Sequence, residues 1–301
     1  MIPKEYDKYE KMVTISAVNF NPTWGDPAAN LKKIKTTVSL ASKLGANIIA
    51  FGELALSGYE CGEEARSEEK PCAMHTEVAE TIPGPSTIEI AKVAKDLGVY
   101  VLIGMTERDE KDAKVHYNSV AVSGPEGLLG RYRKLHLSLP PTYTEQFCFR
   151  RGNELPVFET KYGPIGVQIC QDFWVFPELT RILWLKGSRL IFNCTASAAG
   201  PGRTEFMTHE TSCRATENFV YAISANLVGK ERTISFYGHS TIAGPAYPSF
   251  TNIFAQGGDR EEIVTATLSF ERLHYFTNLI DFKKIRNSEL ILDEFRKLKE
   301  H

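Results

Sequence analysis

The residues VTISAVNFNPTWGDPAANLKKIKTTVSLASKLGANIIAF, numbered 13–51, decide the fold class that this sequence predicts. They begin with eight alternating residues rich in β-formers, which indicate a strand over 13–20. Asp26-Pro27 then supplies the N-cap and the first position of a helix, and Gly45 ends that helix. The apolar run Ile48–Phe51 is typical of a strand buried on both faces. A strand, a helix and a buried strand in succession predict a sheet covered by helices.

The same pattern recurs further along the chain. Ser86-x-x-Glu89 has the spacing of a capping box at the start of a helix, and Gly98 ends that helix. The next buried strand is expected at 99–104, with the sequence VYVLIG. Strands, hairpins and helices then alternate as far as a charged amphipathic helix at about 288–299. This mixture predicts an α/β fold in which helices cover a mixed sheet.

Composition excludes several classes of protein. The 301 residues include 35 Lys and Arg and 37 Asp and Glu, and 43% of the residues are hydrophobic. This composition is typical of a folded domain and not of a disordered chain. The near-neutral charge, without a basic cluster, argues against a nucleic-acid partner. No apolar run approaches the roughly 20 residues of a membrane helix, and the charged N-terminus lacks an apolar signal core. We therefore expect a cytoplasmic protein that binds neither nucleic acid nor membrane.

The cysteines indicate reduced thiols. None of the six is interpreted as part of a Cys-x-x-Cys motif or of a Cys/His ligand pair, so neither a disulfide framework nor a zinc site is predicted. No metal is expected. Apart from two cysteines considered below, their expected role is to fill apolar space. The six are Cys61, Cys72, Cys148, Cys170, Cys194 and Cys213.

Three polar residues lie where predicted strands end. Glu53 follows the strand IIAF, Lys134 ends the segment LLGRYRK, and Cys170 ends the strand IGVQIC. Taken singly, such positions usually hold a solvated acid, a surface lysine and a core thiol. Catalytic groups of α/β folds nevertheless lie at strand ends, where the sheet fixes them and loops admit a substrate. Because a carboxylate, an ammonium and a thiol are chemically complementary, the three together predict a reactive site.

The stretches around these residues resemble the three catalytic motifs of the nitrilase superfamily of carbon–nitrogen hydrolases. They are FGELALSGY at 51–59, GRYRKLHL at 130–137 and ICQDFWVFPE at 169–178. The similarity extends over about 13–286, with the motifs in the family's order. It implies a four-layer α-β-β-α sandwich, organised as one domain over 1–301. It also implies a homodimer or a higher homo-oligomer.

The resemblance assigns a role to each residue. Cys170 is the nucleophile, Glu53 the general base and acid, and Lys134 the cation beside the developing oxyanion. Glu145 occupies the region where many members carry a second glutamate that orients substrate and lysine. The backbone N–H of Gln171 is expected to join Lys134 at the oxyanion. Because a free thiol is mostly protonated at pH 7, the carboxylate is needed to accept its proton. No metal or organic cofactor is implied.

The residues after the nucleophile favour particular branches of the superfamily. Gln171-Asp172 resembles the amidase and N-carbamoyl hydrolase branches more than true nitrilases, which carry Trp-Glu there. One extra residue precedes Phe176-Pro177-Glu178, so pocket shape does not transfer from relatives. Phe173 and Trp174 stand where carbamoyl-D-amino acid hydrolases place an arginine pair. They either contact a hydrophobic or planar part of the substrate or pack in the core or a dimer interface.

Further residues are expected to line or support the pocket. Tyr59, Asn193 and Cys194 are predicted to contact substrate together with Gln171. His136 is expected to support the site structurally, and a Cys–His dyad with the nucleophile is the rival mechanism. Arg214, Glu217 and Asn218 resemble buried scaffold behind the site. Acids of the loop 59–83 are interpreted as a solvated face rather than as a site for a cationic amine: Glu60, Glu63, Glu64, Glu68 and Glu69.

The function predicted from the sequence is that of a cysteine amidohydrolase. It would cleave a linear carboxamide or an N-carbamoyl amine, a small-molecule substrate, through a thioester and release ammonia. A nitrilase that converts a nitrile to an acid and ammonia is one alternative. A non-catalytic scaffold with the same fold is another, although the intact trio of Glu53, Lys134 and Cys170 counts against it.

Overall fold

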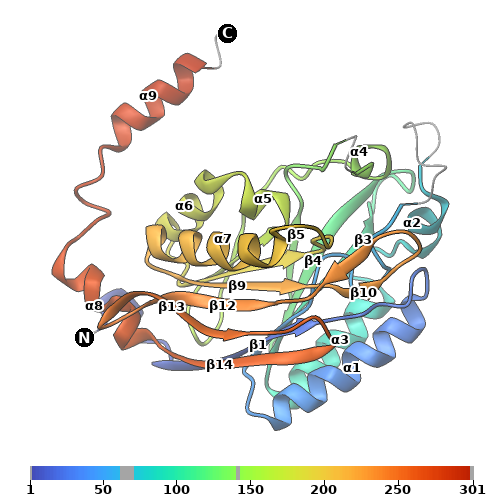
Figure 1. Cartoon of the computed structure of the whole chain (residues 1–301), viewed down its shortest axis with the longest axis horizontal. Helices are drawn as coiled ribbons and strands as arrows, with labels where there is room; N and C mark the ends of the chain where they lie inside the picture. The colour runs from blue at the N-terminus through green and yellow to red at the C-terminus, as the bar shows by residue number, and fades with distance from the viewer. Residues whose placement is uncertain (1, 62–70, 140–142, 299–301) are drawn as a thin grey trace.

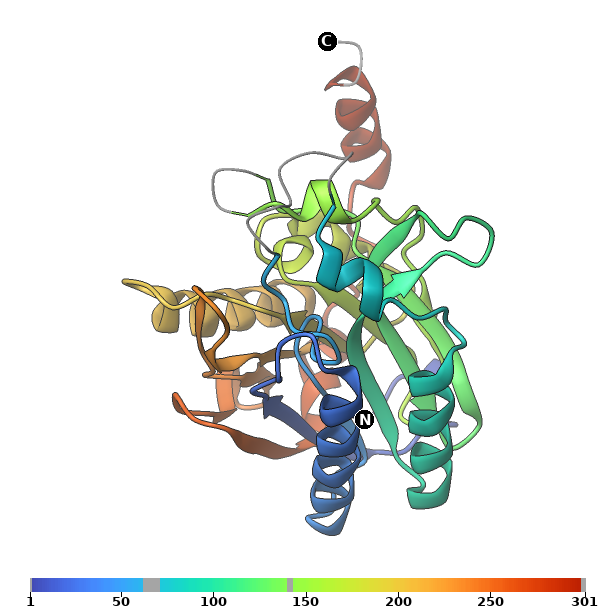
Figure 2. The same ribbon diagram turned by 90° about the vertical axis from the view of Figure 1, so that its right-hand side faces the viewer.

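Two six-stranded sheets lie face to face between two layers of helices (Figures 1 and 2). The computed structural model of the chain describes residues 2–61, 71–139 and 143–298. The first sheet has the order β14-β1-β2-β3-β4-β5. Its strands are β1 (Met12–Asn19), β2 (Ile48–Ala50), β3 (Tyr100–Arg108), β4 (His116–Gly124), β5 (Gly127–Arg133) and β14 (Glu262–Ser269).

The second sheet has the order β13-β12-β9-β8-β7-β6. Its strands are β6 (Val157–Phe158), β7 (Ile165–Ile169), β8 (Leu190–Thr195), β9 (Tyr221–Asn226), β12 (Thr241–Ala246) and β13 (Ser249–Gln256). A separate two-stranded ribbon pairs β10 (Val228–Lys230) with β11 (Ser235–Tyr237). In each six-stranded sheet the central strands are parallel and the edge strands antiparallel.

Helices cover the outer face of each sheet. In Figure 1, α1 (Pro27–Lys43) and α3 (Pro85–Leu97) lie on the first sheet, while α6 (Pro177–Leu185) and α7 (Arg203–Asn218) lie on the second. This confirms the predicted α-β-β-α sandwich. The other helices are α2 (Ala73–Val78), α4 (Glu145–Cys148), α5 (Gln171–Trp174), α8 (Phe270–Leu279), α9 (Ser288–Leu298) and the 3₁₀ turn Lys4–Tyr6. The predicted C-terminal helix is therefore found, and α9 stands away from the sheets without burying a residue (Figure 1).

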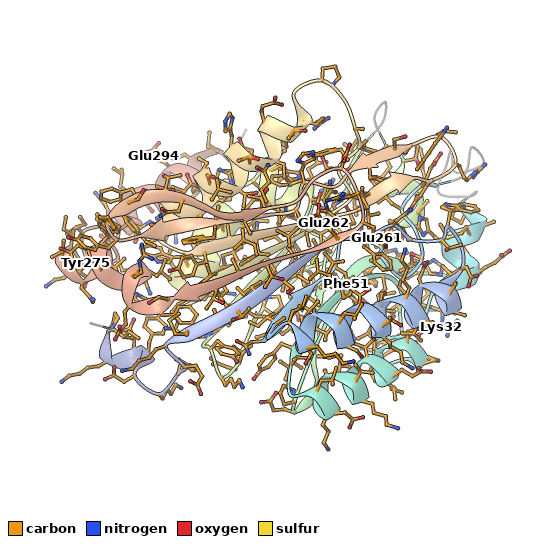
Figure 3. The ribbon with its side chains drawn as sticks, turned by 60° about the horizontal axis from the view of Figure 1, so that its bottom comes forward. Lys32, Phe51, Glu261, Glu262, Tyr275 and Glu294 are labelled. Carbon is orange, nitrogen blue, oxygen red and sulfur yellow. The ribbon has the colours of Figure 1, made fainter. Side chains whose placement is uncertain are left out.

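Burial of β2 on both faces explains its unbroken apolar sequence. Alternate residues of a strand point to opposite faces of the sheet. Ile49 therefore packs in the cluster under α1 and α3, whereas Ile48 and Ala50 pack in the cluster between the two sheets. Each large apolar side chain buried in this way contributes about 1.5–3 kcal/mol. Figure 3 labels Phe51 between Lys32 on α1 and Tyr275 on α8, which lie at opposite ends of the molecule.

Local sequence signals placed one helix start correctly and another incorrectly. Asp26 caps α1 as predicted, because its carboxylate accepts the Ala29 N–H at 2.9 Å. The capping box predicted at Ser86 is wrong. Helix α3 begins two residues earlier, with Gly84 at the N-cap and Pro85 at the first helical position. Proline is favoured there because its fixed φ suits a helix and its missing N–H is not needed.

The ends of strands from both sheets meet at one edge of the sandwich. The turn after β2 and the end of β8 are joined by a hydrogen bond from the Glu53 N–H to the Thr195 carbonyl, at 3.3 Å. At this edge a Cβ on Gly104 of β3 would stand 2.4 Å from the Gly52 carbonyl oxygen. Only glycine fits such an approach, so the sequence of β3 determines where the turn with Glu53 can lie.

No helix in the described parts of the chain combines the length and the apolar character needed to cross a bilayer.

Candidate active site

The Glu53 carboxylate is fully buried and hydrogen-bonded on both oxygens. Its Oε1 accepts from Lys134 Nζ at 2.7 Å and from Asn118 Nδ2 at 2.7 Å. Its Oε2 accepts from the Ala196 N–H at 3.0 Å. These donors come from β4, from the end of β5 and from the segment after β8. The position of Glu53 therefore depends on both sheets.

Lys134 lies between two carboxylates. Its Nζ donates to Glu53 Oε1 and, at 2.8 Å, to Glu145 Oε1, and the side chain has no exposed surface. Burial by itself lowers the pKa of Lys134, but the charges of Glu145 and Glu53 outweigh burial and hold that pKa well above its usual value. The ammonium therefore remains charged throughout the pH range in which proteins are folded.

Glu145 is the first residue of α4 and links Lys134 to Tyr59. Its Oε1 also accepts from the Tyr59 hydroxyl at 2.6 Å, and its Oε2 accepts from the Ser138 N–H at 3.1 Å. Burial and the charge of Glu145 raise the pKa of Tyr59 well above its usual value, so the phenol remains a hydrogen-bond donor. Tyr59, predicted to contact substrate, is buried and holds Glu145 in place.

Cys170 lies directly after β7 in an unusual backbone conformation. Its φ of 48° falls in the left-handed region, which costs a non-glycine residue about 1–3 kcal/mol. The Cys170 N–H donates to Asn193 Oδ1 at 2.9 Å and to the Cys194 carbonyl at 3.1 Å. The sharp turn leaves Cys170 partly exposed and starts α5 at the next residue, Gln171.

The three predicted groups interact electrostatically. Burial and the nearby Glu53 charge raise the pKa of the Cys170 thiol to about 12, although Lys134 acts in the opposite direction. Burial and the Glu145 charge raise the pKa of Glu53 to about 7, against the lowering effect of Lys134 and Asn118. The resting thiol is therefore protonated, and the Glu53 carboxyl group, whose charge acts on that thiol, has a pKa suited to accept a proton near neutral pH.

Asp172 ties the segment after Lys134 to the helix that carries the thiol. Its carboxylate accepts from the Tyr132 hydroxyl, the Leu135 and His136 N–H groups and His136 Nδ1, all within 3.2 Å. The His136 ring also stacks on Phe176, with centroids 3.6 Å apart. The side chain of His136 is thus engaged away from the thiol, which favours the supporting role over a Cys–His dyad.

Arg214 supports the other side of this short helix. Its guanidinium donates to the Phe173 and Trp174 carbonyls of α5, both at 2.9 Å. It also forms ion pairs within α7, to Glu210 and Glu217. Because a helix of four residues cannot satisfy its last carbonyls internally, Arg214 stabilises the turn that presents Cys170.

Four residues predicted to bind substrate are buried away from solvent. Phe173 and Trp174 pack in an apolar cluster under α6 and α7, so the packing alternative applies. Cys194 faces the cluster between the sheets. Asn193 is also buried and holds the backbone of the nucleophile candidate, with its Nδ2 donating to Ser224 Oγ at 3.1 Å. Gln171 is partly exposed, and its side chain accepts from the Ser138 hydroxyl at 2.8 Å.

Sequence reasoning missed residues that surround the thiol. Tyr143 packs edge-on against Tyr59, with ring centroids 5.5 Å apart. Burial, and to a smaller degree Cys170, raises the pKa of Tyr143 and of Tyr237 to about 12, and the charge of Arg203 opposes both shifts. Tyr143 stands in no recognisable motif. Tyr237 and Asn118 stand in the stretches FYGHSTIAGP at 236–245 and YNSVAVSGPEG at 117–127, which resemble weaker landmarks of the superfamily.

The acid Glu60 is not part of a solvated face. It is buried, and its carboxylate accepts from the Thr233 hydroxyl and from the Thr233 and Ile234 N–H groups. Glu231 is buried too and accepts from the Tyr59 and Glu60 N–H groups. Through these hydrogen bonds the two acids hold the β10–β11 ribbon against the segment that begins at Tyr59. The other acids of that loop, Glu63, Glu64, Glu68 and Glu69, lie outside the described residues.

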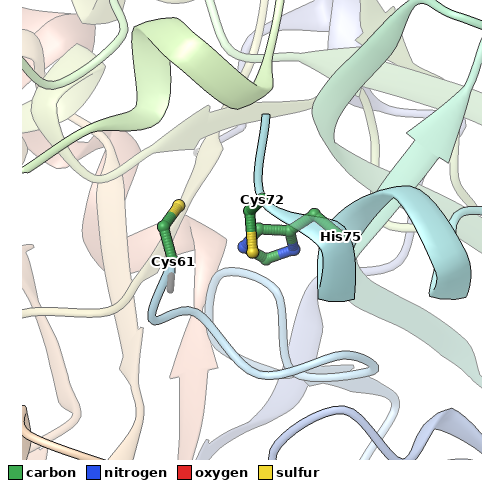
Figure 4. A group of neighbouring side chains, drawn as sticks. All are labelled: Cys61, Cys72 and His75. Carbon is green, nitrogen blue, oxygen red and sulfur yellow. The ribbon is translucent and has the colours of Figure 1, made fainter. Parts of the chain in front are cut away.

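The cysteine analysis also needs correction. Cys72 and His75 are separated by only two residues, which is a common ligand spacing, and the structure brings both close to Cys61 (Figure 4). Cys148, 87 residues from Cys61 in sequence, lies against the same thiol. Cys72 and Cys148 belong to the apolar cluster under α1 and α3, and Cys61 packs against it, as expected of cysteines that fill apolar space. The prediction that no cysteine pairs with a histidine is the one that fails.

Residues 14–275 match the sequence model of the carbon-nitrogen hydrolase family, so the chain belongs to that family. This confirms the resemblance to the nitrilase superfamily. The chain is 35% identical over 283 residues to a nitrilase from Pyrococcus abyssi, covering 92% of this chain and 98% of that one. It is 34% identical to an N-carbamoylputrescine amidase from Solanum tuberosum, covering 84% and 85%. A carbon-nitrogen hydrolase structure from Helicobacter pylori G27 shares the fold, with a TM-score of 0.81 at 21% identity over 94% of this chain and 98% of that one.

Replacing Lys134 by methionine should destabilise the protein in a pH-dependent way. The variant leaves two buried carboxylates without their cation, which costs about 3–5 kcal/mol of unfolding free energy at pH 8. The loss should be smaller at pH 5. Without the cation, the pKa of Glu53 rises above its present value of about 7. The folded variant then binds more protons than the unfolded chain above pH 4.5, so its stability falls as pH rises.

Urea denaturation at the two pH values measures this effect. Lys111→Met, which changes an exposed lysine, is the control and should alter the unfolding free energy by less than about 0.5 kcal/mol. A loss below about 1 kcal/mol for Lys134→Met, or one independent of pH, would show that the buried charge network does not stabilise the fold as described.

Proposed function

We propose that this carbon-nitrogen hydrolase cleaves a linear carboxamide or an N-carbamoyl amine through a thioester on Cys170, releasing ammonia. The observation that carries the proposal is the buried Lys134 bridge between Glu53 and Glu145 beside a partly exposed, backbone-strained cysteine. A scaffold protein gains nothing from burying three charges at such a cost. The similarity to an N-carbamoylputrescine amidase supports the same reaction class.

The proposed reaction moves one proton through Glu53. As the sulfur of Cys170 attacks the carbonyl carbon, Glu53 accepts the thiol proton, and a tetrahedral oxyanion forms. The Lys134 ammonium and the N–H of Gln171, at the start of α5, stabilise that oxyanion, and each such donor is worth about 3 kcal/mol. Glu53 then gives its proton to the departing nitrogen, which leaves a thioester.

Water completes the cycle. Glu53, again ionised, takes a proton from a water molecule that attacks the thioester carbonyl. The resulting tetrahedral species expels the sulfur, and the proton returns to it. A carboxamide thus yields a carboxylic acid and ammonia, and an N-carbamoyl amine yields the amine, carbon dioxide and ammonia. Every proton transfer uses this chain's own residues.

Replacing Cys170 by alanine should abolish ammonia release, with a loss of at least about 10³-fold. Wild-type protein quenched during turnover should carry the acyl mass of the substrate on the peptide with Cys170. The screen includes amides, ureido compounds and nitriles, because one relative is a nitrilase. Cys213→Ala, which removes an exposed thiol, should retain full activity. Undiminished hydrolysis by Cys170→Ala would refute the thioester mechanism.

The pH profile should identify Glu53 as the base. We expect kcat/KM for an amide to rise with pH around a midpoint of about 7, because only ionised Glu53 accepts the thiol proton. No falling limb is expected below about pH 10, since the pKa values of Lys134 and Cys170 lie higher. Glu53→Gln should lose about 10²–10⁴-fold in rate.

Glu231 provides a matched control for this profile. Burial raises its pKa to about 7 as well, but its carboxylate binds the Tyr59 and Glu60 N–H groups away from the thiol. Glu231→Gln should therefore keep the midpoint near 7 even if the rate falls. A midpoint that disappears in Glu231→Gln, or a wild-type midpoint near the ordinary glutamate value, would contradict the assignment to Glu53.

Arg203 suggests which end groups the substrate carries. It begins α7, and its charge acts on both tyrosines that also feel the thiol, Tyr143 and Tyr237. Of the acids on the loop side that the structure describes, Glu60 and Glu231 are occupied by backbone N–H groups. We therefore infer that the site prefers amides whose far end is neutral or anionic over those with an ammonium end.

Arg203→Glu should reverse this preference. The ratio of kcat/KM for a carboxylate-ended amide to that for an isosteric ammonium-ended amide should fall about tenfold at low ionic strength, as expected when a partly screened charge changes sign. Paired assays of the two substrates give the ratio directly. Arg260→Glu makes the same charge change at an exposed position on another segment and should leave the ratio unchanged. Equal kcat/KM ratios in the two variants would show that Arg203 does not select between the substrates.

A further inference from the structure

Three cysteines and a histidine from three segments meet beside Tyr59. The Sγ atoms of Cys61 and Cys148 are 3.2 Å apart. The Sγ atoms of Cys61 and Cys72 and a ring nitrogen of His75 all lie within 4.8 Å of one another. Figure 4 shows Cys72 and His75 side by side at the start of α2, with Cys61 facing them from the neighbouring loop. The amide chemistry proposed above uses none of these four side chains.

We propose that Cys61, Cys72, His75 and Cys148 bind one zinc ion. Zinc in structural sites takes four ligands in a tetrahedron, and three thiolates with one imidazole are an established donor set. With Zn–S bonds of about 2.3 Å, tetrahedral geometry separates the sulfurs by about 3.8 Å. The Cys61–Cys148 pair at 3.2 Å needs to open by only about half an ångström, and Cys72 Sγ and a ring nitrogen of His75 lie within 4.8 Å of Cys61 Sγ.

The hydrogen bonds of His75 suit a metal ligand. Its Nε2 lies 3.2 Å from the Tyr59 carbonyl, and its Nδ1 lies 3.0 Å from Thr106 Oγ1. A carbonyl only accepts, so in this structure Nε2 carries the hydrogen and the Nδ1 lone pair accepts from the Thr106 hydroxyl. An ion bound at Nδ1 would take the place of that hydroxyl. A histidine that binds a metal through one ring nitrogen usually donates the N–H of the other ring nitrogen, for example to a backbone carbonyl. On binding, the Thr106 hydroxyl can keep its contact with Ser57, at 3.3 Å.

Burial and access also fit an ion held by the protein. Cys72, His75 and Cys148 are buried, and Cys61 is partly exposed. A cavity of about 280 Å³, lined by residues that include Pro71, His116 and Cys148, reaches the cluster at Cys148. Binding one Zn²⁺ releases the three thiol protons to solvent, and no electron is transferred.

The ion would join segments that carry part of the candidate active site. Cys61 lies two residues after Tyr59, and Cys148 is the last residue of α4, which begins with Glu145. Tyr59 and Glu145 are hydrogen-bonded to each other at 2.6 Å. A zinc ion at the cluster would therefore fix both ends of that contact. Its role is structural, and it takes no part in the reaction at Cys170.

The test is metal content of the full-length protein purified under reducing conditions without chelator. We expect one zinc per chain by elemental analysis, and a thiolate-to-cobalt charge-transfer band after replacement by Co²⁺. Cys148→Ser and Cys72→Ser should each weaken zinc binding at least about 100-fold. Cys213→Ser, which changes an exposed cysteine outside the cluster, should bind zinc like the wild type. A chelator should lower the wild-type melting temperature, which tests the site even if a variant fails to fold.

Either of two results would overturn the proposal. One is zinc-free protein that takes up no stoichiometric zinc and whose melting temperature does not respond to zinc or chelator. The other is a mass 2 Da lower that maps to a disulfide between two cluster cysteines in protein kept reduced. Both measurements are independent of catalysis, so failure of the zinc site and failure of the proposed amidase activity are distinguishable.

Discussion

The buried ammonium of Lys134, held between Glu53 and Glu145, is the interaction on which the rest of the site depends. Two carboxylates and one ammonium leave a net negative charge inside the protein, which is stable only if neutral donors complete the shell. Asn118 and Tyr59 provide two of these donors, and the others are backbone N–H groups. A change that removes the Ala196 or the Ser138 N–H contact leaves a carboxylate oxygen buried without a partner, and loss of Asn118 or Tyr59 leaves an oxygen with Lys134 as its remaining donor.

That shell connects the architecture to the chemistry. The donors to Glu53 come from both sheets, so the carboxylate is positioned only when the sheets pack against each other. The same packing leaves Cys170 at the end of β7, where its left-handed φ turns the chain into α5. Asp172 and Arg214 hold that short helix from opposite sides. The strain at Cys170 is therefore balanced by hydrogen bonds made by the residues that follow it in α5.

The sequence predicted the positions at which strands end, but not the direction in which neighbouring side chains point. Apolar runs and turn residues are local signals, so they show where a strand ends. From them the sequence predicted that Glu53, Lys134 and Cys170 each follow or end a strand. For β8, both faces are buried, so alternation of polarity is missing and nothing local tells that Asn193 supports the thiol while Cys194 faces the core. Contacts over long separations, such as those of Glu60 with residues 233–234, leave no local signal either. The homo-oligomer implied by the resemblance stays a prediction.

The segment after β2 contains Glu53, Tyr59 and Glu60, whose buried polar groups bind several other segments of the chain. Tyr59 donates through its hydroxyl to Glu145, accepts at its carbonyl from His75 and donates its N–H to Glu231. Three groups on three different segments thus fix one residue, which interacts electrostatically with Cys170 and is hydrogen-bonded to Glu145. Because each contact satisfies a buried polar atom, a shift of Tyr59 breaks several at once. The cysteine cluster lies next to this residue, and the zinc ion proposed there would connect Cys61, two residues after Tyr59, to Cys148 at the end of α4.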